Sequence, residues 1–331
     1  MTILPSKLFS LRLSFRCAIF FFLFQFSAVA QNPADISWRY HSASSFVVAY
    51  HEADKILAIR ILGELQQRQR QLAQRLDYQP RRVITVFLCP TQEIFDHKTG
   101  GVVPHWGEAA ANTAQWRMFL KTPAASNSDE LLSVTVTHEL AHLCLAELAL
   151  PNQLPRWFNE GAAILLSNES RHADPTIISR AILTNSLVEF DEIDDLLSFP
   201  NARAALAYAE SYQAVNFMAH RFGAQAIRRF AQAFGAQNDA RQAFQAAFGV
   251  DLWNFETEYF DDLRRRFRWF FLLDESVLFG AVILILLIAG FFITRRRSRK
   301  KLQEWEKDEE DEENSPPPKV DNDSNAPATS S

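Results

Sequence analysis

Cysteine is scarce in this chain, with three residues in 331. Cys17 lies in an N-terminal segment that we expect to be removed, which leaves Cys89 and Cys144. Two cysteines can form one disulfide in an oxidising compartment, but they do not make the framework that holds small secreted domains together. The main domain must therefore rely on a hydrophobic core, and whether Cys89 pairs with Cys144 stays open.

The chain also lacks an excess of basic residues over the part that forms its main domain. Its formal net charge is −5, and the ten acidic and two basic side chains of residues 302–331 follow a basic block at 295–301. Residues 31–294 are net acidic on their own. A nucleic-acid-binding surface is expected to be basic, so this balance argues against nucleic acid as a partner.

The first 30 residues have the three parts of a secretory signal peptide. Three basic residues come before or at the start of an apolar stretch at 17–26, and the small residues Ala28 and Ala30 fit cleavage before Gln31. We therefore predict a signal peptide over residues 1–30. The alternative is an uncleaved membrane anchor.

A second apolar run contains no charged residue between Val277 and Ile293. Roughly 20 such residues span a bilayer, so this run is just long enough, and we predict a transmembrane helix over residues 277–294. The alternative is a buried core helix. The six basic side chains that follow at once argue against that alternative.

Basic residues next to a membrane-spanning helix remain on the cytoplasmic side. We therefore expect residues 31–268 to lie outside the cytoplasm and residues 295–331 to form a cytoplasmic tail. The tail begins with the basic block, which stops transfer, and continues with the acidic run DEEDEE at 308–313. Its polar composition predicts disorder. It can either bind a cytoplasmic partner or stay solvated without one.

The run HELAH at positions 138–142 places His138, Glu139 and His142 at the spacing of a zinc-hydrolase motif. Residues four apart lie on one face of an α-helix, about one turn apart, so both imidazoles can reach one metal ion. Glu139 lies beside them and can hold and deprotonate a metal-bound water without being a ligand. The surrounding segment 128–148 has no glycine or proline and is apolar on most sides, which predicts a buried helix.

A catalytic zinc needs three protein ligands and one open position, so two histidines leave one ligand missing. Glu160, in the later run RWFNEGAA, is the best candidate to supply it. The alternative is that His138 and His142 are hydrogen-bonded core residues and that Glu139 is a surface residue. That alternative has to treat the Asn-Glu-Gly run around Glu160 as accidental.

HELAH followed by LPRWFNEGAA (154–163) resembles the gluzincin metallopeptidases, and most closely their peptidase MA-like domains. The resemblance covers about residues 39–268. It implies an α+β fold of the thermolysin type, with a small N-terminal sheet lobe, the HExxH active-site helix and a C-terminal helical lobe. It also implies Zn2+ as the cofactor, with His138, His142 and Glu160 as its ligands.

The same resemblance implies two catalytic side chains. Glu139 would be the general base and then the proton donor to the leaving amine. A tyrosine hydroxyl would stabilise the tetrahedral oxyanion, and Tyr208, fifteen residues before Gly223, has the spacing that the resemblance suggests. Tyr212, one helical turn further along, is the second candidate. Either tyrosine can also be an ordinary half-buried aromatic.

The chain departs from the resemblance at two places. The segment HWGEAAANTAQW (105–116) lacks the glycine-rich motif with which aminopeptidases of this group hold a free amine, although Glu108 is nearby. This absence argues against aminopeptidase activity and leaves endo- and exopeptidase action undecided. Thermolysin-like enzymes place an acidic residue four positions after the ligand glutamate, where it orients a zinc histidine. Here that position is Ile164, so another residue must orient the histidine.

Hydrophobic periodicity predicts strands before the motif and helices after it. We expect strands at 45–50, 82–89 and 113–121 and a long amphipathic helix at 53–76. The strand at 113–121 is expected at the sheet edge that lines the cleft, where an extended peptide can pair with it; plain core structure is the alternative. Helices are expected at 177–183, 191–197, 203–221, 225–234, 240–248 and 255–267, with Gly223, Gly235 and Gly249 at helix ends.

Together these features predict a single-pass membrane protein with a zinc metallopeptidase domain outside the cytoplasm, acting on a peptide or protein substrate. By analogy with the proteins that the chain resembles, we prefer a bacterial inner membrane with the domain in the periplasm. Two alternatives remain open. One is a non-catalytic protein that keeps the fold for binding partners near the membrane, and the other is a zinc hydrolase of a non-peptide substrate.

Overall fold

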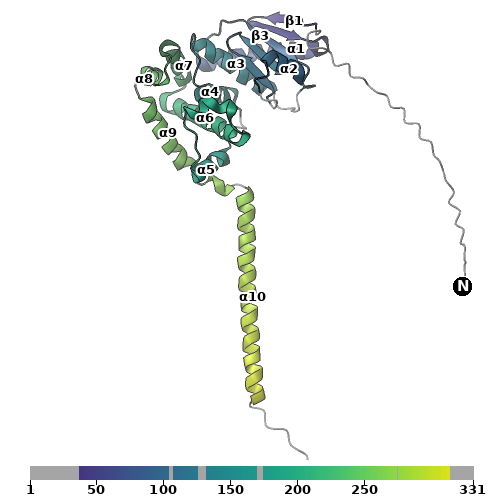
Figure 1. The fold of residues 1–331 in the computed structure, drawn as a ribbon, viewed down its shortest axis with the longest axis vertical. Helices are drawn as coiled ribbons and strands as arrows, with labels where there is room; N and C mark the ends of the chain where they lie inside the picture. The colour runs from purple at the N-terminus through teal and green to yellow at the C-terminus, as the bar shows by residue number, and fades with distance from the viewer. Residues whose placement is uncertain (1–36, 104–106, 126–131, 170–173, 274, 314–331) are drawn as a thin grey trace, which may run out of the picture. The chain divides into compact units, whose positions relative to one another are not determined.

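The structure is a computed structural model that describes residues 37–103, 107–125, 132–169, 174–273 and 275–313. The chain divides into two units, Met1–Ser37 and Trp38–Ser331, and every element described below belongs to the second. The predicted signal peptide and the end of the predicted tail lie outside the described residues. The described elements confirm a mixed α+β fold, in which a small sheet is followed by helices (Figure 1).

A five-stranded sheet forms the first part of the domain. Its strand order is β1-β2-β3-β5-β4, in which β2, β3 and β5 are parallel and the two outer strands run antiparallel to their neighbours. The strands are β1 (Arg39–Ala43), β2 (Phe46–Tyr50), β3 (Ile84–Cys89), β4 (Ala109–Asn112) and β5 (Arg117–Lys121). The strands predicted at 45–50 and 82–89 are confirmed as β2 and β3.

Helices cover both faces of this sheet. They are α1 (Lys55–Leu76), α2 (Gln92–Thr99) and α3 (Leu132–Leu148), of which α1 confirms the helix predicted at 53–76. Side chains alternate along a strand, so Ile84 and Val86 of β3 are buried in the main core, on the side of α1 and α3. Phe87 belongs to the opposite face, where Lys98 of α2 lies 5.0 Å from the centroid of its ring.

The prediction for 113–121 is wrong in the extent of the strand and in its place. Only its last five residues form a strand, β5, which lies inside the sheet between β3 and β4. The residues before it form a hairpin turn, in which the Gln115 amide donates a hydrogen bond of 3.0 Å to Oδ1 of Asn112 and Trp116 has a φ of 54°. The edge strand next to β5 is β4, whose alanine run has little strand propensity and therefore gives no signal in the sequence.

The helical part of the domain follows α3. It contains α4 (Arg156–Ser167), α5 (Pro175–Thr184), the 3-10 helix η4 (Glu192–Ser198), α6 (Asn201–Phe222), α7 (Ala226–Gln237), α8 (Ala240–Phe248), α9 (Leu252–Phe267) and the 3-10 helix η5 (Phe270–Leu273). The helices predicted after the motif correspond to α5, η4, α6, α7, α8 and α9. Figure 1 shows the sheet on one side of α3 and these helices on the other.

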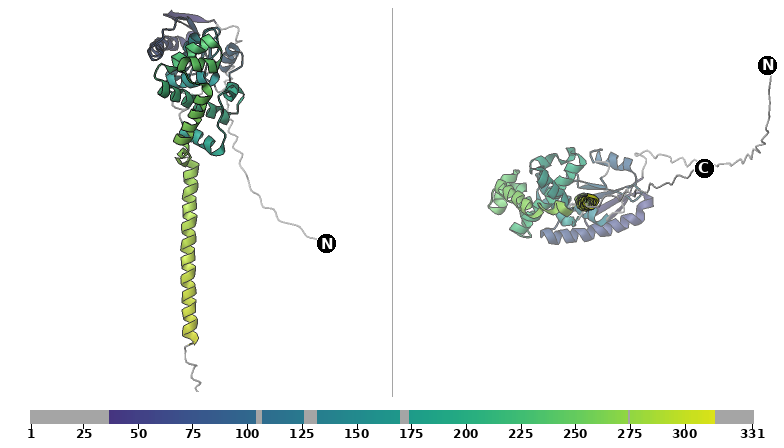
Figure 2. Two further views of the ribbon diagram at one scale, coloured as in Figure 1. Left: turned by 90° about the vertical axis from the view of Figure 1, so that its left-hand side faces the viewer. Right: turned by 90° about the horizontal axis from the view of Figure 1, so that it is seen from below.

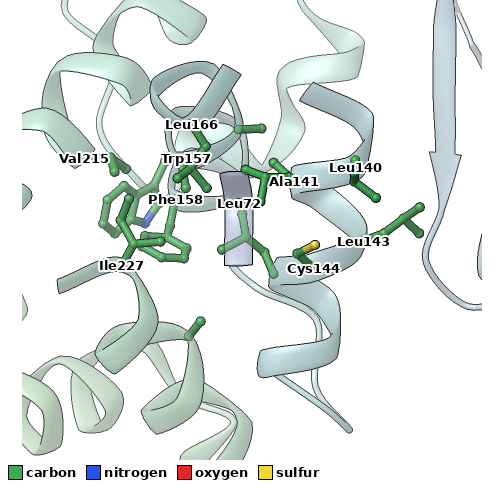
Figure 3. Packing of buried hydrophobic residues seen from close by; sticks show 14 of the residues in the cluster. Leu72, Leu140, Ala141, Leu143, Cys144, Trp157, Phe158, Leu166, Val215 and Ile227 are labelled. Carbon is green, nitrogen blue, oxygen red and sulfur yellow. The ribbon is translucent and has the colours of Figure 1, made fainter. Parts of the chain in front are cut away.

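One hydrophobic core runs through both parts of the domain. Side chains from α1, α3, α4, α6 and α7 meet in it (Figure 3). Aromatic rings fill much of the helical part: Trp157 of α4 stacks on Phe190 with 4.2 Å between ring centroids, and Phe158 lies 4.5 Å from Phe230. Because these large rings are buried, their packing fixes the rotation of α4 about its axis. It thereby also fixes the direction in which the side chains of the next turn of α4 point.

The last described element is α10 (Glu275–Glu313), a single uninterrupted helix (Figure 2). Among the described helices it is the one that is long and apolar enough to cross a membrane, with the candidate span within Leu278–Lys307 and its charge-free part ending before Arg295. The sequence predicts disorder in the tail, whereas the helix continues through the basic block to the end of the acidic run. Residues 295–313 contain no proline or glycine and are rich in Arg, Lys and Glu, so a helix nucleated by the apolar stretch can extend through them.

Candidate metal centre

The two histidines of the HELAH run come together on α3. Their rings lie side by side, with centroids 4.7 Å apart and the Nε2 atoms of His138 and His142 3.1 Å apart. Two ring nitrogens this close need a shared proton or cation between them. The arrangement expected from the spacing of the motif is therefore present in the structure.

Glu160 reaches the two histidines from α4. Its Oε2 atom lies 3.7 Å from Nε2 of His138 and 3.6 Å from Nε2 of His142. One potential ligand atom from each of the three residues lies within 4.8 Å of the others. The three side chains are only 11% to 15% exposed, so a cation among them would be shielded from most of the solvent. The structure thus brings the three predicted ligands together.

Glu139 follows His138 on α3 and is half-buried. Burial raises the pKa of its carboxyl above the usual range, although the charges of His142 and His138 act in the opposite direction. A carboxylate with a raised pKa is a better proton acceptor at neutral pH. Glu139 is not one of the three residues whose ligand atoms converge, as expected of a base rather than a ligand.

A further carboxylate holds His138 from the other side of its ring. Oε2 of Glu169 lies 2.9 Å from Nδ1 of His138, and the Glu169 side chain is almost fully buried. The sequence predicts that some residue other than Ile164 orients a histidine, but it does not identify which one. Glu169 can make this contact because Asn168 ends α4 in a left-handed conformation and redirects the chain. Sequence reasoning missed Glu169. An acidic residue directly after an asparagine that ends a helix is the signal that could have identified it.

The carboxylates around the histidines favour positive charge between them. Burial alone would lower the pKa of His138, but the carboxylates of Glu160 and Glu169, one beside each ring nitrogen, raise it to about 10. Burial alone would raise the pKa of Glu160, but the charges of His142 and Arg156 help to hold it at about 2. The site therefore stabilises an added cation, and a metal ion bound there would replace the proton of the imidazole.

Both candidate tyrosines lie on α6, which packs against α4. Burial raises the pKa of the Tyr208 hydroxyl, and the negative charge of Glu160 raises it further. The hydroxyl therefore stays protonated and can donate a hydrogen bond near the ligand residues. Tyr212 is half-buried one turn further along the same helix.

A glycine next to Glu160 sets how closely α4 and α6 approach each other. A Cβ atom at Gly161 would collide with the backbone carbonyl of Ser211 and would lie 2.8 Å from Cγ2 of Val215. The absence of a side chain at this position lets α4, which carries Glu160, and α6, which carries the tyrosines, pack backbone to backbone. The sequence alone does not reveal this role of the glycine.

The comparison with protein families extends this picture beyond the motif. The family model described as the peptidase MA superfamily matches residues 93–264. The chain belongs to the peptidase MA superfamily. The matched part of this peptidase MA chain begins in α2, ends in α9 and contains α3, α4 and α6 with the residues of the candidate centre. None of the curated proteins compared with the chain matches it.

Membership of the peptidase MA superfamily confirms the resemblance carried by HELAH and LPRWFNEGAA. It indicates a metallopeptidase-like domain, in which His138, His142 and Glu160 could bind the metal. Two imidazole nitrogens and one carboxylate oxygen form a donor set that suits a catalytic zinc. The residues present therefore fit the metal that the peptidase MA resemblance implies.

The two cysteines of the peptidase MA domain take no part in this centre. Cys89 and Cys144 are buried free thiols, so the disulfide that the sequence left open is not formed in this structure. Burial raises the pKa of each thiol to about 12. Neither therefore forms a thiolate, the state in which cysteine binds zinc, at neutral pH.

Proposed function

We propose that this chain is a membrane-anchored zinc metallopeptidase that hydrolyses peptide bonds outside the cytoplasm. The observation that carries the proposal is the convergence of His138, His142 and Glu160, with Glu139 beside them. A structural zinc site is closed by a fourth side chain, whereas a catalytic one keeps a position open for water. Among the described residues, three side chains have potential ligand atoms that converge at this point.

Each protein group has a separate task in the proposed reaction. Bound zinc would polarise the scissile carbonyl and lower the pKa of water. Glu139 accepts the proton of the attacking water and passes it to the leaving amine, and its raised pKa suits both steps. Glu169 holds Nδ1 of His138, so that Nε2 keeps its lone pair for the metal. Tyr208 donates a hydrogen bond to the oxyanion of the tetrahedral intermediate.

The proposed substrate is a peptide or protein that binds in extended form. β4 is one of the two edge strands of the described sheet, so its outer backbone groups can pair with the backbone of a substrate. β4 also packs against α3, the helix that carries His138 and His142. An extended chain added along β4 would therefore pass close to the metal ligands. Nucleic acid is not a proposed partner, because residues 31–294 are net acidic.

The proposed membrane anchor is the apolar part of α10. Six basic side chains follow the span within residues 295–301, and four precede it within 264–268. Two of those four, Arg264 and Arg266, are paired with aspartates, so most of the unpaired basic charge follows the span. By the positive-inside rule the residues after the span are cytoplasmic and the domain is not. The periplasmic face of a bacterial inner membrane remains the preferred location of the domain. On the cytoplasmic side, the acidic run at 308–313 can bind a partner.

Metal analysis of the purified full chain tests the metal site. The protein is expected to hold about one zinc ion per chain, and a His142→Ala variant is expected to lose it. Folded protein that holds no zinc, even after metal is added back, would contradict the proposal. The non-catalytic scaffold would then be the better description.

A Glu139→Gln variant separates the chemistry from metal binding. It is expected to keep its zinc and to lose hydrolysis of a peptide library by about 100-fold or more, because the base is gone while the ligands remain. Unchanged hydrolysis would remove Glu139 from the mechanism. If zinc is bound and no peptide is cut, a panel of non-peptide esters and amides tests for a different substrate class.

A further inference from the structure

The surface where the domain ends and the membrane helix begins combines arginines with exposed apolar side chains. We call it the juxtamembrane surface and define it by Arg264 and Arg265 at the end of α9, Arg268 and Trp269 in the turn after it, and Leu272 in η5. The Arg264 side chain is 54% exposed, Trp269 is 60% exposed and Leu272 is 46% exposed. Exposed large apolar groups that gather in one place indicate contact with something other than water.

The positive charge of this surface is only partly neutralised. Arg264 lies 3.3 Å from Asp261, whereas no described residue places a carboxylate within ion-pair distance of Arg265 or Arg268. The guanidinium of Arg268 lies 4.6 Å from the centroid of the Trp269 ring, so the cation and the ring form one unit. Two cationic groups therefore stay available for an external anion.

The segment between α9 and the membrane helix is fixed to the domain and is not a free stalk. The Phe271 amide donates a hydrogen bond of 2.8 Å to Oγ of Ser179, a fully buried residue of α5. The rings of Phe267 and Phe270 lie 5.6 Å apart and join the end of α9 to η5. The juxtamembrane surface therefore moves together with the domain.

The chain is short between this fixed segment and the proposed span. Seven residues lead from Phe271 to Leu278, the first residue of the apolar stretch. They reach about 25 Å when fully extended and about 10 Å when helical. Because the Debye length is about 8 Å at physiological salt, a helical connection brings these cations within reach of the charge on the bilayer.

We propose that the juxtamembrane surface binds the headgroups of anionic lipids in the leaflet where the span begins, and so holds the domain down on the membrane. Arginine forms paired hydrogen bonds with phosphate, and an anionic leaflet attracts basic residues near its surface. Tryptophan is enriched at the boundary between headgroups and acyl chains, because one part of its ring is apolar and another polar. This inference rests on the membrane anchoring proposed above, but not on zinc or catalysis.

Brominated lipids test this contact in the full chain. The protein is inserted into vesicles of phosphatidylcholine, with or without phosphatidylglycerol, whose acyl chains carry bromine close to the headgroup. The signal of Trp269 is obtained by difference from a Trp269→Phe variant. Bromine quenches tryptophan fluorescence only on close approach, so Trp269 is expected to be quenched strongly in the anionic vesicles and weakly in the neutral ones.

Charge variants test whether the arginines hold the surface in place. The double variant Arg265→Gln/Arg268→Gln is expected to shift the ratio of docked to undocked domain, read from the quenched fraction of Trp269, by roughly 30-fold. The matched control is Arg60→Gln/Arg70→Gln, which removes two exposed arginines from α1 and should leave the ratio unchanged.

Carbonate extraction distinguishes a failure of lipid binding from a failure of the proposed membrane anchoring. A chain that carbonate washes from the vesicles is not inserted, which contradicts the anchoring itself. A chain that resists extraction while Trp269 stays unquenched contradicts lipid binding and leaves the anchoring intact. Equal quenching in neutral vesicles and in the double variant would likewise contradict recognition of anionic headgroups.

Discussion

At the scale of single residues, the candidate centre depends on what surrounds its histidines. Oε2 of Glu160 faces Nε2 of His138, and Oε2 of Glu169 faces Nδ1 of the same ring. Both nitrogens of His138 therefore have a fixed carboxylate neighbour, which sets the orientation of the ring before a metal binds. A substitution of Glu169 would therefore disturb the proposed metal site without removing a proposed ligand.

Replacing Glu169 by Gln is expected to weaken zinc binding by about 10- to 100-fold, because a neutral amide polarises the imidazole less and orients it less firmly. Competition with a chromophoric chelator measures this affinity without any turnover. Glu189→Gln, a change of an exposed carboxylate, is the control and should leave the affinity unchanged. Equal affinities in the Glu169 variant and the original chain would show that this contact does not support the metal.

Replacing Tyr208 by Phe is expected to lower kcat by about 100-fold, since one hydrogen-bond donor to the oxyanion is lost while the fold and the ligands stay. The zinc content should not change, and the change in KM should be small. Tyr212→Phe is the matched control on the same helix and should have little effect. Should the larger loss occur in Tyr212→Phe, the two tyrosines exchange roles.

The sequence predicts some of these contacts and not others. That His138 and His142 meet follows from helix geometry, because a spacing of four residues becomes adjacency on one face. The approach of Glu160 is predicted by a resemblance and not by spacing. The contact of Glu169 depends on the left-handed turn at Asn168 and on the packing of α4 against α3, and neither is visible in a local pattern.

At the scale of secondary-structure elements, the contact between α4 and α6 determines the distance between the proposed ligand Glu160 and the tyrosines. Gly161 lies where a side chain on α4 would collide with the backbone of α6. A side chain there would push the helices apart and would move Tyr208 away from the histidines. The same small residue thus affects both the stability of the helical part and the geometry of the site.

A Gly161→Ala variant is expected to lower the free energy of unfolding by about 3 kcal/mol, because the added methyl group has no room against the Ser211 carbonyl. Gly63→Ala is the control: Gly63 lies on the exposed side of α1 with nothing within 4 Å of an added Cβ, and alanine there should stabilise the helix by about 1 kcal/mol. Urea unfolding of the detergent-solubilised chain measures both. Equal stability of Gly161→Ala and the original chain would mean that the two helices can separate freely.

Helix ends show where a local pattern predicts structure and where it misleads. Gly223 and Gly249 end α6 and α8 as predicted. The prediction for Gly235 is wrong, because α7 continues past it and ends at Asn238 in a left-handed conformation. A Cβ atom at Gly235 would lie 3.0 Å from the carbonyl oxygen of Leu150, so this glycine allows close packing instead. A glycine can end a helix or allow close packing, and only the tertiary structure determines which role a given glycine has.

At the scale of the whole molecule, the domain and the proposed span are joined without a spacer. The sequence predicts the apolar span because its length and composition are local properties. It does not predict that η5 is fixed to α5, because Phe271 and Ser179 are 92 residues apart. This long-range contact makes η5, which lies beyond the predicted end of the domain at residue 268, part of the domain.

Inserting about twelve flexible Gly and Ser residues after Leu273 is expected to let the domain rise by about 20 Å. Hydrolysis of a soluble peptide should stay the same. Two membrane-anchored reporters, one cleavable close to the bilayer and one further out, measure the reach of the site. The original chain should cut the closer site faster, and the extended chain should lose that preference. The absence of a preference in the original chain would contradict a site held near the membrane.

The length of α10 has a consequence for the cytoplasmic side in the proposed orientation. Its 39 residues correspond to about 58 Å of helix, nearly twice the hydrocarbon thickness of about 30 Å. Asp308 lies 14 residues beyond Thr294, or about 20 Å along the axis. The helix thus carries the acidic run at 308–313 beyond the lipid, where a basic protein could bind it without competing with the phosphates of the inner leaflet.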